Sequence, residues 1–140
     1  MLLLFALPGS IRGRMMQDML YAEMFEKADL VVVAKPVATR ATSERERLLG
    51  IEVIGVNTEF QTRLVLKGKK TNHKFVLHHY RLAHPNEPIV NGPDLAVFHP
   101  SEHKAFLMFL VKEGDGRYAP VSGQVDPAAF SILELNRTAE

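Results

Sequence analysis

The residues of this sequence that could carry chemistry are six histidines, one Ser-x-x-Lys motif and a basic stretch near the middle of the chain. His99 and His103 are four positions apart, a spacing that puts two metal ligands on the same face of a helix. Pro100 lies between them and an apolar run follows at Ala105, which leaves room for about one helical turn. With His84 as a third ligand, these histidines are the candidates for a metal site. The alternative, which we favour, is that all three are polar loop residues, so no cofactor is predicted.

Two further histidines are adjacent in an alternating segment. Successive side chains of a strand point to opposite faces, so His78 and His79 are not expected to chelate one metal together. We expect one of them to face the protein interior and to be hydrogen-bonded there.

The Ser-x-x-Lys motif is formed by Ser101 and Lys104, a spacing at which a lysine can activate a serine nucleophile. Its companion motifs Ser-Asp-Asn and Lys-Thr-Gly are absent from the sequence, and a serine that follows a proline is typical of a turn. The sequence also lacks a GxSxG elbow, a P-loop and a GxGxxG motif. We therefore predict no catalytic residues and a protein that is not an enzyme.

The basic stretch contains no acidic residue between Gln61 and Asn86. It has a charge of +6, so the rest of the chain has −5 and the total is +1. Lysines interleaved with aromatic side chains are typical of proteins that bind single-stranded nucleic acid or another anionic polymer. The candidate ligand-binding residues are Arg63, Lys67, Lys69, Lys70, Lys74 and Tyr80. The alternative, which we favour because the total charge is close to zero, is a solvated hairpin whose edges are protected by lysine.

The elements expected to position these residues are mostly strands. Apolar or alternating segments predict strands at residues 29–35, 51–67, 74–82, 105–111, 117–121 and 129–135, and helical spacing predicts an amphipathic helix at 15–27. In the second strand, alternation predicts that Phe60, Thr62, Leu64 and Leu66 share the buried face. The polar, charge-alternating residues 39–47 predict a loop or hairpin tip, and residues 83–103 predict a long irregular connection.

These elements predict a mainly β fold, a small OB-like antiparallel barrel of five to six strands with an N-terminal amphipathic helix, formed by residues 15–140 as one domain. The chain has 140 residues, of which 46% are hydrophobic, so it can bury a core without disulfides. It has no cysteine, which excludes cysteine-ligated zinc, iron–sulfur clusters and thiol nucleophiles.

Residues 1–14 begin with an apolar run that ends at Pro8 and is too short to span a bilayer, so we predict no transmembrane segment here. We interpret this segment as the remainder of a truncated signal peptide. The alternative is an apolar segment that packs on the fold. On the first interpretation the protein is exported, to the periplasm or outside the cell, rather than cytoplasmic.

Several segments together resemble a known family. They are a helix followed by Ala28-Asp-Leu-Val-Val-Val-Ala34, the strand end Leu64-Val-Leu-Lys-Gly68, Lys74-Phe-Val-Leu77, and Phe106-Leu-Met-Phe-Leu-Val111 with Asp115-Gly-Arg-Tyr118. Over residues 25–135 this pattern is similar to bacterial exported domains of the netrin-module, or tissue-inhibitor-of-metalloproteinase-like, OB-fold type. The resemblance implies a five-stranded barrel and a binding or adaptor role. Animal inhibitors of this family chelate the protease metal through an N-terminal cysteine, and this chain has none, so that activity is not expected here.

The sequence thus predicts a non-enzymatic binding or interaction domain whose ligand is a small molecule or a protein. Anionic-polymer binding through the 63–81 hairpin and histidine-dependent metal binding are the two alternatives.

Overall fold

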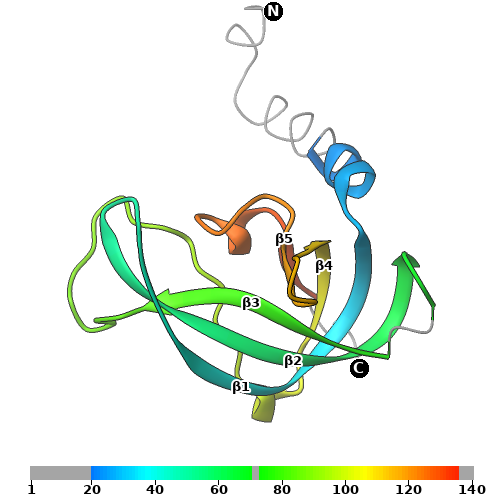
Figure 1. Ribbon diagram of the computed structural model, residues 1–140, viewed down its shortest axis with the longest axis horizontal. Helices are drawn as coiled ribbons and strands as arrows, with labels where there is room; N and C mark the ends of the chain where they lie inside the picture. The colour runs from blue at the N-terminus through cyan, green and yellow to red at the C-terminus, as the bar shows by residue number, and fades with distance from the viewer. Residues whose placement is uncertain (1–19, 71–72, 136–140) are drawn as a thin grey trace, which may run out of the picture.

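The computed structural model describes residues 20–70 and 73–135, and most of them belong to one sheet. The six strands are β1 (Leu30–Leu48), β2 (Ile51–Lys67), β3 (Lys74–Leu82), β4 (Ala105–Lys112), β5 (Tyr118–Pro120) and β6 (Ile132–Leu135). A helix at residues 20–27 precedes β1, and two short 3-10 helices, η2 (Pro100–Glu102) and η3 (Pro127–Ala129), lie in the connections. The prediction of a mainly β fold with about six strands and an N-terminal helix is confirmed (Figure 1).

The strands are hydrogen-bonded in a ring. Their order is β1-β2-β3-β5-β4-β6, and β1 pairs in addition with β4, so five strands return to their start and β6 is attached to β4. All pairs are antiparallel except β3 with β5, which meet in parallel at Leu77 and Tyr118. The prediction of a wholly antiparallel arrangement is therefore wrong. Strand direction cannot alternate all the way round a ring of five, so one neighbouring pair has to be parallel.

The core fills the inside of this ring. Phe60, Leu77 and Met108 are fully buried there, and Phe98 enters from the irregular segment that joins β3 to η2. The Phe98 ring packs edge-on against Phe60 and Phe106, with centroids 5.0 Å apart in both pairs. The long irregular connection predicted from the sequence therefore contributes a core residue as well as surface.

The predicted loop at residues 39–47 is strand instead. β1 continues to Leu48, and the hairpin tip lies at Leu49 and Gly50, both with positive φ. These polar residues pair with the first half of β2, whose other edge is already paired with β3. Backbone pairing along a strand that is itself fixed on its far side thus outweighs the absence of an apolar pattern.

The predicted buried face of β2 is correct at Phe60 and wrong at Leu64 and Leu66, which are 54% and 49% exposed. Arg63 and Leu66 have no partner in the β1 register, so each is the extra residue of a bulge. One extra residue turns the side chains beyond it to the opposite face. Leu64 therefore points outward, and Val65 packs against the core in its place.

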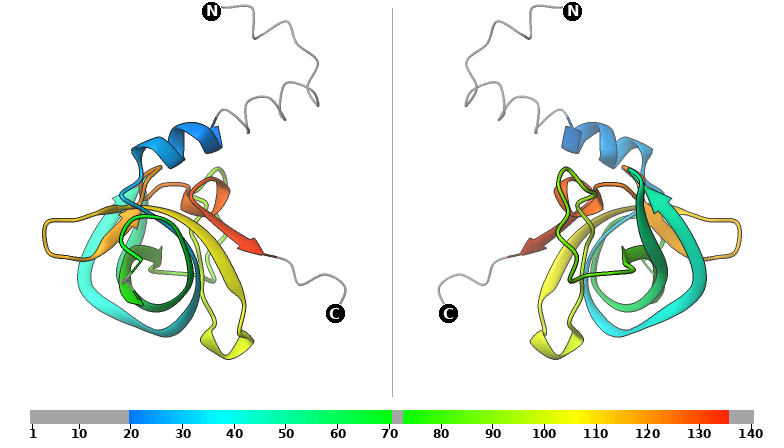
Figure 2. Two further views of the ribbon diagram at one scale, coloured as in Figure 1. Left: turned by 90° about the vertical axis from the view of Figure 1, so that its right-hand side faces the viewer. Right: turned by 90° about the vertical axis from the view of Figure 1, so that its left-hand side faces the viewer.

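The helix covers part of the outer face of the sheet, beside the ring (Figure 2). Met24 and Ala28 pack there on Val31 and Phe109. The Nζ of Lys67 donates hydrogen bonds to the carbonyls of Phe25 and Glu26, 2.7 and 2.8 Å away, which satisfies acceptors at the end of the helix. The first residues of the predicted helix, and the apolar 1–14 segment, lie outside the described residues. Within the part that is described, no helix has the length and apolar character needed to cross a membrane.

Candidate cationic pocket

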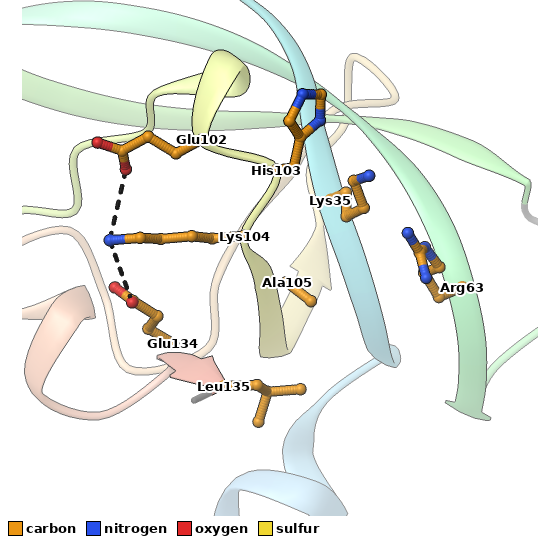
Figure 3. A pocket seen from close by; sticks show the side chains of 8 residues that line it. All are labelled: Lys35, Arg63, Glu102, His103, Lys104, Ala105, Glu134 and Leu135. Carbon is orange, nitrogen blue, oxygen red and sulfur yellow. Dashed lines mark ion pairs between the residues drawn. The ribbon is translucent and has the colours of Figure 1, made fainter. Parts of the chain in front are cut away.

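A pocket of about 350 Å³ opens on the outer face, where β1 and β4 separate. It collects basic side chains from three parts of the chain (Figure 3). We call it the cationic pocket. Its lining residues are Lys35, Arg63, Glu102, His103, Lys104, Ala105, Glu134 and Leu135.

Local backbone structure explains why these residues meet. The pairing of β1 with β4 ends at Ala34 and Phe106, so the next residues, Lys35 and Ala105, are no longer paired with each other. Ala105 is small and leaves the space between the walls open. Arg63 is the extra residue of the first β2 bulge and is exposed beside β1. A bulge is a known means of redirecting a side chain toward a site.

The opposite wall is set by the turn before β4. η2 ends at Glu102 and is capped by His103, whose φ of 57° is left-handed. Its backbone N–H donates to the carbonyl of Pro100, 3.2 Å away, which closes the turn. His103 and Lys35 both line the pocket (Figure 3).

The charges of the pocket fall into two groups. Lys104 forms ion pairs with Glu134 at 3.2 Å and with Glu102 at 3.4 Å. The hydrogen bonds to Glu134 and then to Glu102 raise the pKa of Lys104. The side chains of Lys35 and Arg63 have no ion pair or hydrogen bond to any described residue, and they lie on the side of the pocket away from Lys104 (Figure 3).

This arrangement is suited to an anion. Arginine presents a planar fork of N–H donors that matches a carboxylate or a phosphate, and the lysine adds a second positive charge. Lys104 does not fit the role of a serine-activating base, because its raised pKa keeps it protonated while Ser-x-x-Lys chemistry requires a lysine that accepts a proton.

The structure separates the residues of the basic stretch. Lys67 is bound to the helix end, Lys74 lies 3.9 Å from Glu59, and Lys69 and Lys70 are exposed at the turn. Tyr80 is only 8% exposed, so its ring is not available for a base to stack on. Only Arg63 from this set lies in the cationic pocket.

The three candidate metal ligands lie apart. The Nε2 of His84 is 3.2 Å from Glu52 and the ring lines a different pocket, next to the β1–β2 tip. His99 precedes η2 and is exposed, while His103 lines the cationic pocket. Among the residues of 20–70 and 73–135, no three His, Asp or Glu side chains are grouped so that they could hold a metal ion.

The adjacent histidines do point to opposite faces, and both are buried. His79 faces the core, where its Nε2 is hydrogen-bonded to the hydroxyl of Thr58 at 2.7 Å. Burial, and then the neighbouring His78, lower the pKa of His79 to about 4. The expectation of one interior, hydrogen-bonded histidine is therefore confirmed.

His78 belongs to a polar cluster on the other face, which the sequence reading missed. Its Nδ1 is 3.0 Å from Glu113 and its Nε2 is 3.1 Å from Glu44, although the latter contact lacks hydrogen-bond geometry. Arg117 lies 3.5 Å from Glu44 and bonds Asn57 on β2 at 2.8 Å. The cluster joins β1, β2, β3 and the β4–β5 turn, so its role is to hold the ring together.

The pKa of Glu44 shows which interactions dominate in this cluster. Burial alone would raise its pKa, but hydrogen bonds from Thr42 and Arg117 outweigh it, so the pKa of Glu44 is lowered. Gly55 on β2 lies beneath this cluster, and an isolated glycine within a strand is a sequence sign of a bulge or a bend. The irregularity lies in the paired strand, between Ala41 and Arg45, where Glu44 and Thr42 lie over the glycine.

No protein-family model matches the chain, and no curated protein matches it either.

Proposed function

We propose that this protein is a non-enzymatic binding module whose cationic pocket takes an anionic group of its ligand, a carboxylate or a phosphate. The observation that carries the proposal is the pair Lys35 and Arg63. Both open into the pocket, and neither has an ionic partner in the described part of the chain, whereas the nearby Lys104 has two. Two such cations on one concave surface attract an anion from solution.

We also propose that the hydrogen-bonded ring is a small OB-like barrel, with β6 and the helix as additions. The five-strand ring supports this assignment, because an OB-fold is a partly open barrel of five strands. OB-folds bind oligonucleotides and oligosaccharides on a strand face and its adjoining loops, and the pocket likewise lies on β1, β2 and β4 and on the turn before β4. Export, and the family resemblance, belong to the same proposal and rest on the sequence alone.

The test is a titration of the full chain with succinate and with inorganic phosphate. Binding is detected through the changes in the amide chemical shifts of Lys35 and Arg63 in ¹H–¹⁵N NMR spectra. We expect saturable shifts at the pocket with either anion and none with the neutral analogue succinamide. A charge-assisted hydrogen bond is worth roughly 1.5–3 kcal/mol, so Arg63→Met should weaken binding about tenfold or more.

Lys70→Met is the matched control. It removes one positive charge at the exposed hairpin turn, outside the pocket, and should leave the affinity almost unchanged. If Lys70→Met and Arg63→Met weaken anion binding equally, the attraction comes from the general charge of the protein and the pocket proposal is wrong.

Lys104→Met tests how the charges of the pocket are arranged, at a residue that is not a proposed ligand contact. Without Lys104, Glu102 and Glu134 lose their partner and leave two uncompensated carboxylates on the pocket wall. Anion affinity should fall even though Lys104 is not the proposed ligand contact. The double variant Lys104→Met, Glu134→Gln should recover part of it, because it removes one of those carboxylates.

A further inference from the structure

An apolar strip runs across the outer face of the sheet, between the helix and the cationic pocket. Val33 lies directly opposite Leu64 on β2 and Leu107 on β4, and Leu107 lies opposite Leu133 on β6. Residues directly opposite each other in neighbouring strands have adjacent side chains on one face. We call these four residues, Val33, Leu64, Leu107 and Leu133, the outer strip.

The helix covers only the neighbouring row of this face. Its side chains pack on Val31 and Phe109, two positions along their strands from Val33 and Leu107. Leu107 and Leu133 touch the edge of that packing and stay partly exposed, and Leu64 is 54% exposed. A continuous apolar row on one face of a sheet is usually buried against another element.

On its other side the outer strip borders the cationic pocket. Two positions further along the same strands and on the same face lie Lys35, Ala105 and Leu135, all of which line the pocket. The outer face therefore changes from apolar to cationic along the strands. It runs from the row under the helix, through the partly exposed outer strip, to the two cations whose side chains have no partner among the described residues.

We propose that the outer strip and the cationic pocket together dock an acidic amphipathic helix of a partner protein. This inference rests on the proposed anion-binding function and names its ligand. The helix would place its apolar side on Val33, Leu64 and Leu107 and would direct an Asp or Glu carboxylate to Lys35 and Arg63. Charge complementarity favours an acidic occupant, and the chain's own helix on the adjoining row shows that this sheet face accepts a helix as its covering layer.

The experiment is a selection of random 16-residue peptides, displayed on phage, against the full chain. We expect enriched peptides with apolar residues at spacings of three and four and with acidic residues at one end of that pattern. Their affinity should fall about fivefold or more with Leu64→Thr, which removes apolar contact, and about tenfold or more with Arg63→Met.

Two controls separate this inference from the proposed function. Leu64 is exposed, so Leu64→Thr should keep the urea midpoint of the unmodified chain and should bind succinate as the unmodified chain does. Lys70→Met should bind the selected peptides normally. Normal succinate binding together with no enriched acidic peptide, or with enriched peptides that Leu64→Thr does not affect, overturns the docking surface and leaves the anion pocket intact.

Two further measurements would reveal a different occupant of the outer strip. Sedimentation equilibrium that shows a dimer, dissociated by Leu64→Thr, would assign the strip to a second copy of this chain. Dodecanoate that binds far more tightly than succinate and loses this advantage with Leu64→Thr would assign it to a long-chain carboxylate. Either result would replace the partner helix.

Discussion

The buried histidine of the core makes the stability of this protein depend on pH. His79 is 3% exposed and its pKa is lowered to about 4, from 6.5 for an unperturbed histidine. Between these two values the unfolded chain binds a proton at this position and the folded chain does not. The folded state is therefore at full stability above about pH 6.5 and loses stability as the pH falls toward 4. At about 1.4 kcal/mol for each pKa unit, the loss amounts to about 3 kcal/mol.

Urea unfolding of the full chain, measured between pH 7.5 and pH 4.5, gives this quantity directly. The comparison is with His79→Leu, which cannot take up the proton. That variant loses the hydrogen bond to Thr58, so it should be less stable at pH 7, by about 1–3 kcal/mol. Its stability should nevertheless fall less than that of the unmodified chain as the pH drops, so the two curves should converge toward pH 4.5.

His84→Gln is the control for the other histidines. His84 is exposed and lies beside Glu52, so its removal should leave the slope between pH 6.5 and 4.5 close to that of the unmodified chain. If His79→Leu and the unmodified chain lose the same free energy of unfolding between pH 7 and pH 4.5, His79 is not kept neutral by burial.

Three further substitutions test how the ring and its helix are held. Gly55→Ala should destabilise the protein by about 1–3 kcal/mol in urea unfolding, because the added Cβ collides with Glu44 and Thr42 on the paired strand, and an unchanged midpoint would contradict this packing. Met24→Ala should cost about 2–3 kcal/mol and raise amide exchange in the helix, since it removes a side chain that is 6% exposed. Lys67→Met should cost about 1 kcal/mol by freeing two helix carbonyls, whereas equal exchange rates at the helix end would show that these bonds contribute little.

Much of the fold was readable from the sequence because strand periodicity and turn residues are local signals. Lys74–Leu82 forms a strand as predicted, and residues 113–116 form a turn in which the N–H of Glu113 donates to the carbonyl of Arg117 at 2.7 Å. The β1–β2 tip was misplaced because residues 39–47 pair with a distant strand, and their polar composition carries no trace of that partner. Ring closure through β1 and β4 joins residues more than seventy positions apart and leaves no local signal either.

The candidate site was only partly readable. Arg63 was selected for its place in a basic stretch and His103 for its spacing from His99, and the structure brings these two into one pocket for which neither reason was given. Lys35 was missed, because a lysine at the end of an apolar strand is an ordinary strand boundary in sequence. Lys35 can contribute to an anion site because of its neighbours. On one side the pairing of β1 with β4 has ended, and on the other side lies Arg63 in the bulge of β2.

The two bulges of β2 connect the wrong sequence prediction with the proposed function. Strict alternation after Phe60 would bury Leu64 and Leu66 and leave Val65 outside. The extra residue at Arg63 reverses this order, so Val65 fills the core and Leu64 enters the outer strip. Continued without a second bulge, the reversed order would turn Lys67 into the core, which is costly for an unpaired charge. The extra residue at Leu66 turns it outward again, where it reaches the helix end. A strand with neither bulge would leave the outer strip without Leu64. The bulges that make the alternating pattern of β2 a wrong guide to burial are therefore also the reason that Leu64 belongs to the proposed docking surface.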